Sequence, residues 1–170
     1  SKKAVVLLSG GLDSAVTLYH AKAAGYEAHA LIFDYGQRHR REVAAARAVA
    51  RGAKVPAEVV RISMPWKGSA LLDSAVRVPS RGVKKNVIPS TYVPARNIIF
   101  LSFAASFAEA IGARVIFIGA NAVDYSGYPD CRPRFFRAFQ AALDQGLKTG
   151  VQHKGIRILT PLLNMTKTGI

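Results

Sequence analysis

The sequence predicts an α/β fold in which helices cover both faces of a mostly parallel β-sheet. Short runs of β-branched and aliphatic residues alternate with segments of helical periodicity, a pattern typical of consecutive βαβ units. In addition, the first apolar run ends in the stretch "SGGLDS" at residues 9–14, where a glycine turn leads directly into a helical segment. A buried strand of a parallel sheet enters its crossover helix in this way.

The first half of the chain predicts the order strand, helix, strand, helix, strand. The apolar run at 3–8 indicates a strand buried on both faces, because it does not alternate with polar residues. Gly25 is a typical C-terminal cap for the helix that follows. The predicted elements are strands at 3–8, 27–33 and 58–62, a helix at 14–24 and a basic amphipathic helix at 39–51.

The second half continues this alternation after an interruption. Residues 63–95 are rich in proline, glycine, serine and charge, and a loop of this length in a compact domain indicates a functional loop or lid. The elements predicted after it are a helix at 97–111, a strand at 114–120, a helix at 132–147 and a short strand at 157–159. The whole predicts a Rossmann-like, doubly wound sheet, whose ligands bind at the carboxyl ends of the strands. The loops at 9–14, 34–39 and 119–131 lie at such ends.

Length and composition predict one soluble domain spanning residues 1–170. Half of the residues are apolar, yet no apolar run approaches the roughly 18 residues that cross a bilayer. The start "KKAVVLL" resembles a signal peptide but lacks a small-residue cleavage site, so we expect a cytoplasmic protein without membrane contact. A lone cysteine, Cys131, can form neither an internal disulfide nor a structural zinc site.

The chain is strongly basic, with 24 Lys and Arg against 10 Asp and Glu and a formal net charge of +14. Such a field attracts polyanions, so we expect an anionic partner, either nucleotide phosphates or nucleic acid. Two other readings stay open. The cations can be scattered over solvated helix faces, or an acidic segment of a longer native chain can be absent from this sequence.

The "SGGLDS" stretch predicts a phosphate site. Gly10 and Gly11 permit a backbone in which consecutive N–H groups converge on an anion at a helix start. Ser9 and Ser14 can add hydroxyl donors, and Asp13 can act through a bridging Mg²⁺ or as the helix N-cap. The stretch is neither a Walker A loop nor a GxGxxG motif. The alternative is an ordinary tight turn between strand and helix, which also favours glycine and a Ser or Asp cap.

Strand, "SGGLDS" and helix together resemble the PP-loop of the ATP pyrophosphatase superfamily, which binds the pyrophosphate that leaves ATP. Four further stretches are similar to the QueC family of 7-cyano-7-deazaguanine synthases: "FDYGQRH" (33–39), "STYVPARN" (90–97), "GANAVDYSGYPDCRP" (119–133) and "TPLLNMTK" (160–167). The resemblance spans nearly the whole chain, and "DYSGYPDCR" is its most discriminating part. It implies the adenine nucleotide alpha hydrolase-like version of the fold, with ATP and Mg²⁺ as cofactors.

The resemblance also implies a reaction of queuosine biosynthesis. An ATP-dependent ligase would convert the small molecule 7-carboxy-7-deazaguanine and ammonia into the nitrile through an adenylated intermediate. This chemistry is sensible, because adenylation replaces oxide, a very poor leaving group, by AMP. A homodimer is implied as well, whereas nucleic acid is not expected as a partner but is not excluded by the charge.

Carried over residue by residue, the resemblance assigns three groups of site residues. Catalysis is assigned to Asp13, Ser14, Arg96 and Lys167. ATP binding is assigned to Leu8, Ser9, Gly10, Gly11, Leu12, Asp13, Ser14, Asp34, Gln37, His39 and Gly119. Substrate binding is assigned to Tyr125, Ser126, Tyr128, Asp130 and Arg132, with aromatic rings for stacking and Asp130 for the N–H edge of the base.

Structural explanations compete with several of these roles. Arg96 can be a cation at a helix start, Lys167 can simply be exposed, and His39 can merely begin a helix. The 125–132 segment can be a well-hydrogen-bonded loop without a ligand. Cys131 is expected to pack as a small buried hydrophobe, since no step of the reaction requires a covalent nucleophile.

The sequence departs from the family pattern in three places. The family ends in a zinc-binding cysteine cluster that this chain does not contain, so no protein-bound metal is predicted here. Arg134 and Gly169 stand where many relatives carry glutamate. Two other functions therefore stay open: a PP-loop enzyme that adenylates tRNA, which the positive charge favours, and a nucleotide-binding sensor without catalysis.

Overall fold

The computed structural model describes residues 2–36, 41–66, 92–121, 124, 127–166 and 168–170. Its centre is a five-stranded sheet in the order β3-β2-β1-β4-β5, in which all neighbouring strands pair in parallel. The strands are β1 (Lys2–Leu7), β2 (Tyr26–Asp34), β3 (Ala57–Arg61), β4 (Val115–Phe117) and β5 (Arg157–Leu159). This order confirms the predicted doubly wound sheet.

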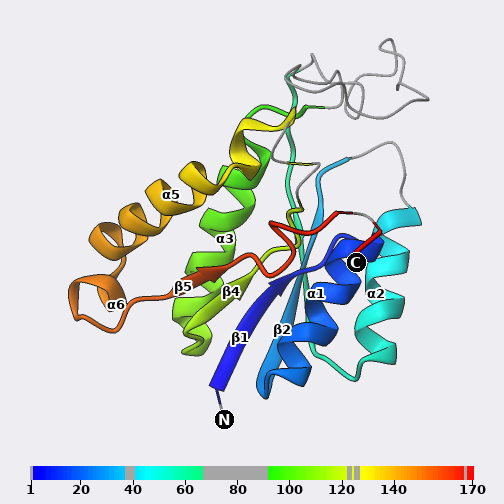
Figure 1. The fold of residues 1–170 in the computed structure, drawn as a ribbon, viewed down its shortest axis with the longest axis horizontal. Helices are drawn as coiled ribbons and strands as arrows, with labels where there is room; N and C mark the ends of the chain where they lie inside the picture. Colours follow the sequence, from blue (N-terminus) through cyan, green and yellow to red (C-terminus); the bar gives the residue numbers. More distant parts are fainter. Residues whose placement is uncertain (1, 37–40, 67–91, 122–123, 125–126, 167) are drawn as a thin grey trace.

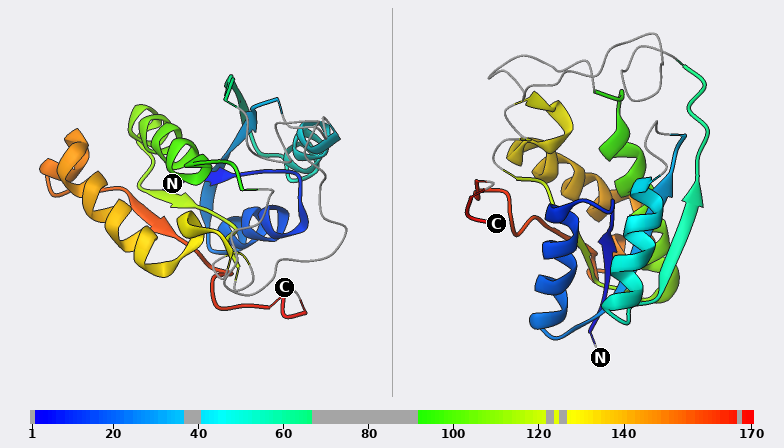
Figure 2. Two further views of the ribbon diagram at one scale, coloured as in Figure 1. Left: turned by 90° about the horizontal axis from the view of Figure 1, so that it is seen from above. Right: turned by 90° about the vertical axis from the view of Figure 1, so that its right-hand side faces the viewer.

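Helices cover both faces of the sheet, as Figure 1 shows. The helices are α1 (Leu12–Ala23), α2 (Arg41–Gly52), α3 (Arg96–Ile111), α5 (Pro133–Gly146) and α6 (Lys148–Val151), with a 3-10 turn, η1 (Pro129–Cys131), before α5. Figures 1 and 2 show α1 and α2 on one side of the sheet and α3 and α5 on the other.

Alternation along β1 divides the core into two layers. Val6 and its neighbours on alternate positions pack with Leu18 of α1 and Ala46 of α2. Val5, on the opposite face, packs with Leu101 of α3 and with α5. Because successive side chains of a strand point to opposite faces, a strand covered by helices on both faces must be apolar throughout. The uniform run at the start of the chain therefore forms the central strand.

The predicted element boundaries need small corrections. Helix α1 begins at Leu12, two residues earlier than predicted, and Gly25 follows it at φ 83° as the expected cap. Strand β4 is shorter than the predicted 114–120. The helix predicted at 132–147 is confirmed as α5, which ends at Gly146 because Leu147 has an extended backbone with ψ 146°, and the short α6 that follows was not predicted. Most of the long loop predicted at 63–95 lies outside the described residues.

The carboxyl ends of the strands form one edge of the sheet, and the chain reverses its winding there between β1 and β4. In Figure 1 the segment after β5 passes this edge toward the start of α1. Crevices at such switch points are the usual ligand sites of doubly wound sheets. Among the described residues, none of the helices is both long and apolar enough to cross a membrane.

Candidate active site

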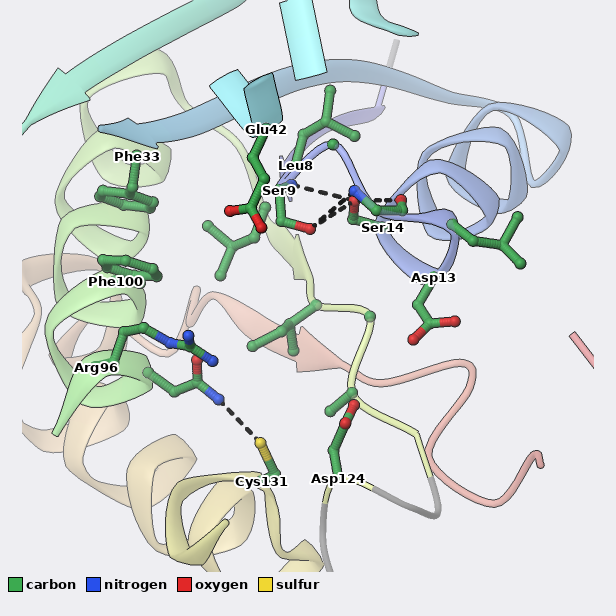
Figure 3. A pocket seen from close by; sticks show the side chains of 18 of the residues that line it. Leu8, Ser9, Asp13, Ser14, Phe33, Glu42, Arg96, Phe100, Asp124 and Cys131 are labelled. Atoms are coloured by element: carbon green, nitrogen blue, oxygen red, sulfur yellow. Dashed lines mark hydrogen bonds between the residues drawn. The ribbon is translucent and has the colours of Figure 1, made fainter. Parts of the chain in front are cut away.

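A cavity of about 590 Å³ opens at the switch point. Its walls come from five parts of the chain: the glycine loop at 7–14, the end of β2 at 33–35, the start of α2 at 41–45, the start of α3 at 96–100, and residues 118–120, 124, 128 and 131 after β4. Figure 3 shows these side chains converging from the glycine loop, from α3 and from the loop after β4. The cavity is large enough for a nucleotide-sized ligand.

The glycine loop at the cavity floor needs glycine at one position for two reasons. Gly10 has φ 88°, which favours glycine. A Cβ atom there would also collide with the carbonyl oxygen of Glu42 and lie 3.0 Å from the backbone nitrogen of Ala46. The loop therefore lies against the first turns of α2.

Two serines close the loop onto the start of α1. The Ser14 hydroxyl donates to the carbonyl oxygen of Gly11 over 2.9 Å and accepts the Ser9 N–H over 3.1 Å. The Ser9 hydroxyl lies 3.0 Å from that of Ser14 and accepts the Gly11 N–H over 3.3 Å. The hydroxyls of Ser9 and Ser14, which were predicted to donate to phosphate, thus form hydrogen bonds within the loop itself. The first N–H groups of α1 have no acceptor within the helix and point toward the loop.

Asp13 does not cap α1, contrary to one of its two predicted roles. The N-cap position belongs to Gly11, and Asp13 lies in the first turn. Its carboxylate instead accepts a 2.7 Å hydrogen bond from the side-chain amide of Asn121. The Asn121 side-chain oxygen accepts the Asp124 N–H over 3.1 Å, and the Asp124 carboxylate accepts the Asn121 N–H over 3.2 Å. The glycine loop and the loop after β4 are therefore joined through a buried asparagine.

Gly119 makes a second contact between these two loops. A Cβ atom at this position would lie 2.9 Å from the Thr17 hydroxyl and 3.0 Å from the Asp13 carbonyl oxygen. Thr17 itself donates to that carbonyl over 2.8 Å. The chain after β4 can therefore approach α1 only because residue 119 has no side chain.

Arg96 and aromatic rings form the opposite wall. Arg96 Nη1 donates to the Tyr35 hydroxyl over 3.4 Å. Burial alone would lower the pKa of Arg96, but the adjacent Tyr35 helps to outweigh burial and the pKa lies above its ordinary value, so the guanidinium is charged. Phe33 and Phe100 stack with their ring centroids 4.0 Å apart. This wall combines a fixed cation with flat apolar surface.

Next to Arg96 lies a buried polar cluster of Asn97, Asp130 and Cys131, of which Asn97 and Cys131 also line the cavity. The Asn97 side-chain amide donates to the Asp130 carbonyl and to Cys131 Sγ, both over 3.1 Å. Burial, with a smaller effect of nearby Asp130, raises the pKa of Cys131 to about 12. The thiol is therefore protonated near neutral pH, which agrees with the predicted packing role.

The structure gathers most of the predicted site residues around the cavity. Those that line it are Leu8, Ser9, Gly10, Gly11, Leu12, Asp13, Ser14, Arg96, Gly119 and Tyr128. Three others do not line it: Asp34 lies 3.9 Å from Arg61 Nε, Asp130 binds Asn97, and Arg132 is exposed ahead of α5. Gln37, His39, Tyr125, Ser126 and Lys167 lie outside the described residues.

Several residues that line the cavity or hold its walls in place were not predicted from the sequence. Asn121 and Asp124 belong to the stretch "GANAVDYSGYPDCRP", but only their hydrogen bonds single them out. Tyr35 and Glu42 follow the end of β2, the edge at which ligands were expected. For Phe100, an aromatic residue in an alanine-rich helix was the only signal. Among the described residues, no three His, Cys, Asp or Glu side chains are grouped to hold a metal ion.

Solved structures share this fold at low sequence identity. A predicted subunit of tRNA methyltransferase from Methanocaldococcus jannaschii has a TM-score of 0.60 at 16% identity, over 99% of this chain and 72% of the other. An NH3-dependent NAD synthetase from Campylobacter jejuni has a TM-score of 0.53 at 14% identity, over 99% and 60% of the two chains. A 4-thiouridine synthetase, solved with RNA and bound ATP, has a TM-score of 0.53 at 20% identity, over 98% and 38%. These likenesses confirm the predicted Rossmann-like α/β fold.

Relatives of known sequence are much closer. A 7-cyano-7-deazaguanine synthase of Hydrogenovibrio crunogenus is 53% identical over 172 residues, which cover 99% of this chain and 74% of the relative. A synthase of the same name from Thermoplasma acidophilum is 52% identical over 171 residues, covering 99% and 71%. The profile of the family described as "Queuosine biosynthesis protein QueC" matches residues 3–170. The chain therefore belongs to the QueC family, as its motifs predicted.

Proposed function

We propose that the chain is an ATP-dependent ligase that converts 7-carboxy-7-deazaguanine and ammonia into 7-cyano-7-deazaguanine. The observation that carries this proposal is the combination, in one cavity, of a glycine loop at a helix start with a charged arginine and stacked aromatic rings. The name shared by relatives 50–54% identical over nearly the whole chain supports the same reaction.

In this proposal the glycine loop binds the phosphates of ATP. The N–H groups at the start of α1 and the positive end of its dipole favour an anion there. Mg²⁺ prefers carboxylate and phosphate oxygens and usually binds through only one or two protein carboxylates. Asp13 lines the cavity beside the loop and fits that requirement. Mg²⁺ would supply charge neutralisation of the phosphates, and Lys167 is proposed as a further phosphate contact.

Arg96 and the aromatic wall are proposed to bind the deazaguanine acid. A guanidinium matches a carboxylate or a phosphate through its planar fork, so Arg96 can hold the two reacting anions close together. The flat rings of Phe100 and Tyr128 line the same cavity and offer surface to a planar base. Tyr125 and Ser126 remain proposed base contacts on the basis of their sequence motif.

The reaction requires activation twice. A carboxylate oxygen attacks the α-phosphorus of ATP and expels pyrophosphate; ammonia then attacks the carbonyl carbon and expels AMP, which leaves the amide. The amide oxygen attacks the α-phosphorus of a second ATP and expels pyrophosphate, with loss of one N–H proton; loss of AMP and the second N–H proton then forms the nitrile. Both activations bring the same groups together, so one site that positions them and neutralises charge serves both.

A cytoplasmic location and a homodimer belong to this proposal as well. The homodimer rests on the resemblance to the family, and light scattering of the purified protein would measure it directly.

The test is incubation of the full-length protein with 7-carboxy-7-deazaguanine, ammonium and Mg-ATP, followed by mass spectrometry of bases and nucleotides. We expect nitrile and AMP from the natural protein and neither from Asp13→Ala. Asp144→Ala is the matched control, because Asp144 is exposed on α5 and bonds only to Gln140 among the contacts described. Failure of the natural protein to consume the acid, with ATP still bound, would refute the proposal.

A further inference from the structure

Helix α3 begins without a cap from its own sequence. Ala95, at the N-cap position, has no side-chain acceptor and adopts φ 56°, a left-handed conformation that is uncommon for residues other than glycine. Arg96 is the first residue of the helix and lies directly on this turn. A turn of this kind persists only when the surrounding structure holds it in place.

Asp130 supplies the missing cap from 33 residues away. Its Oδ2 atom accepts the Asn97 N–H over 2.9 Å. Its carbonyl oxygen also accepts the Asn97 side-chain amide, which reaches Cys131 Sγ as well. Asp130 is only 6% exposed and Asn97 9%. A buried carboxylate at a helix N-terminus both satisfies an N–H group and meets the positive end of the helix dipole.

Arg96 and Asp130, which meet at this turn, differ in their relation to the cavity. Arg96 lines the cavity and reaches Tyr35, whereas Asp130 is not among the lining residues. Figure 3 shows the Arg96 side chain entering the cavity from α3, with the dashed bond to Cys131 close to it. The Asp130 carboxylate is therefore placed to fix the turn that carries Arg96 rather than to meet a ligand.

We propose that Asp130 is a positioning residue that acts through Asn97 on Arg96. By holding the first turn of α3, it sets where the Arg96 guanidinium stands in the cavity. This inference rests on the proposed function for the anion that Arg96 meets. It replaces the expectation from the sequence that Asp130 binds the N–H edge of the base.

Kinetics of four proteins separate the two roles: the natural protein, Asp130→Ala, Arg96→Ala and the double variant. If Asp130 acts through Arg96, Asp130→Ala lowers kcat/KM by about tenfold or more in the natural background and by less than about twofold beside Arg96→Ala. If the kcat/KM of the double variant instead falls by the product of the two single-variant losses, the proposal is overturned. Asp130→Asn keeps one acceptor oxygen, so we expect it to restore most of kcat/KM. A direct contact with two N–H groups of a base would predict no such rescue.

A structural measurement decides the question without turnover. The Nε–H signal of Arg96 in a ¹H–¹⁵N spectrum is assigned by its loss in Arg96→Lys. We expect this signal to move in Asp130→Ala, to move less in Asp130→Asn and to stay in place in the control Asp144→Ala. If Asp130→Ala does not fold, Asp130→Asn carries the comparison. An unmoved Arg96 signal in a folded Asp130 variant would overturn the proposal, whereas an inactive natural protein would count against the proposed function alone.

Discussion

The side-chain amide of Asn121 donates a 2.7 Å hydrogen bond to the carboxylate of Asp13, although the two residues are 108 positions apart. Asn121 is fully buried and also exchanges hydrogen bonds with Asp124. One asparagine therefore fixes the acidic residue of the glycine loop from the far side of the switch point.

Asn121→Ala is expected to lower both stability and activity. Removing the amide takes one hydrogen bond from the Asp13 carboxylate and one from the Asp124 N–H in this partly buried site, which costs about 1–3 kcal/mol. We also expect kcat/KM to fall, because the Asp13 carboxylate is no longer held. Urea denaturation and nitrile formation measure the two effects. Asn164→Ala is the control, since Asn164 is exposed and its removal should change stability by less than about 0.5 kcal/mol. Equal stability of the two variants would contradict the role given to Asn121.

Gly10→Ala is expected to damage the loop more than backbone strain alone explains. Gly36 provides the control, because it has a similar φ of 75° but nothing described within 4 Å of an added Cβ atom. We predict that Gly36→Ala costs about 1–2 kcal/mol from strain. Gly10→Ala adds a collision with the Glu42 carbonyl, for a further 1–3 kcal/mol or so. Thermal unfolding and ATP titration compare the two; an equal loss would show that the approach to α2 is unimportant.

Gly119→Ala tests the second contact between the loops. The added methyl would lie 2.9 Å from the Thr17 hydroxyl and 3.0 Å from the Asp13 carbonyl. We predict a loss of about 1–3 kcal/mol in the free energy of unfolding, together with weaker ATP binding. Gly52→Ala, with nothing described within 4 Å of its Cβ position, should leave ATP binding unchanged. Normal ATP affinity in Gly119→Ala would refute the coupling of this glycine to the phosphate loop.

The buried thiol of Cys131 predicts a pH dependence at high pH. Its pKa rises from 9.0 to about 12 on folding, mainly because burial disfavours the thiolate. Below pH 9 the thiol is protonated in both the folded and the unfolded chain, so its contribution to the free energy of unfolding is complete. As pH rises from 9 toward 12, only the unfolded chain ionises and this contribution is lost. We expect the natural protein to lose stability relative to Cys131→Ala above pH 9, by at most about 1.4 kcal/mol per pH unit. If the free energy of unfolding changes with pH in the same way for the natural protein and Cys131→Ala from pH 8 to 10.5, this prediction is contradicted.

The fold could be predicted from the sequence because its signals are local. The uniform run of β1, the glycine turn and the cap at Gly25 are each read within a few residues. Boundaries were less accurate where tertiary contacts decide them. The short helix α6, which was not predicted, is one case, because Thr149 donates its N–H to Glu109 of α3 over 2.8 Å. That contact lies 40 positions away and leaves no local pattern.

The candidate site was likewise predictable where its residues form a local motif, and not where distant contacts decide their roles. The glycine loop is a continuous motif, and residues 8–14 all line the cavity, while their roles in binding ATP stay predictions. The roles of Asn121 and Asp130 depend on partners 108 and 33 positions away, which no spacing reveals. The motif therefore predicts a ligand contact for Asp130, whereas the structure places its carboxylate on the start of α3.

The most direct test of the proposed reaction follows the oxygen atoms of the substrate. We would supply 7-carboxy-7-deazaguanine with both carboxylate oxygens labelled as ¹⁸O and analyse the nucleotide products by mass spectrometry. Adenylation at both stages predicts that each AMP formed carries one labelled oxygen and that the nitrile carries none. Label found in inorganic phosphate with ADP as the nucleotide, or released only into water, would contradict attack on the α-phosphorus and with it the central claim.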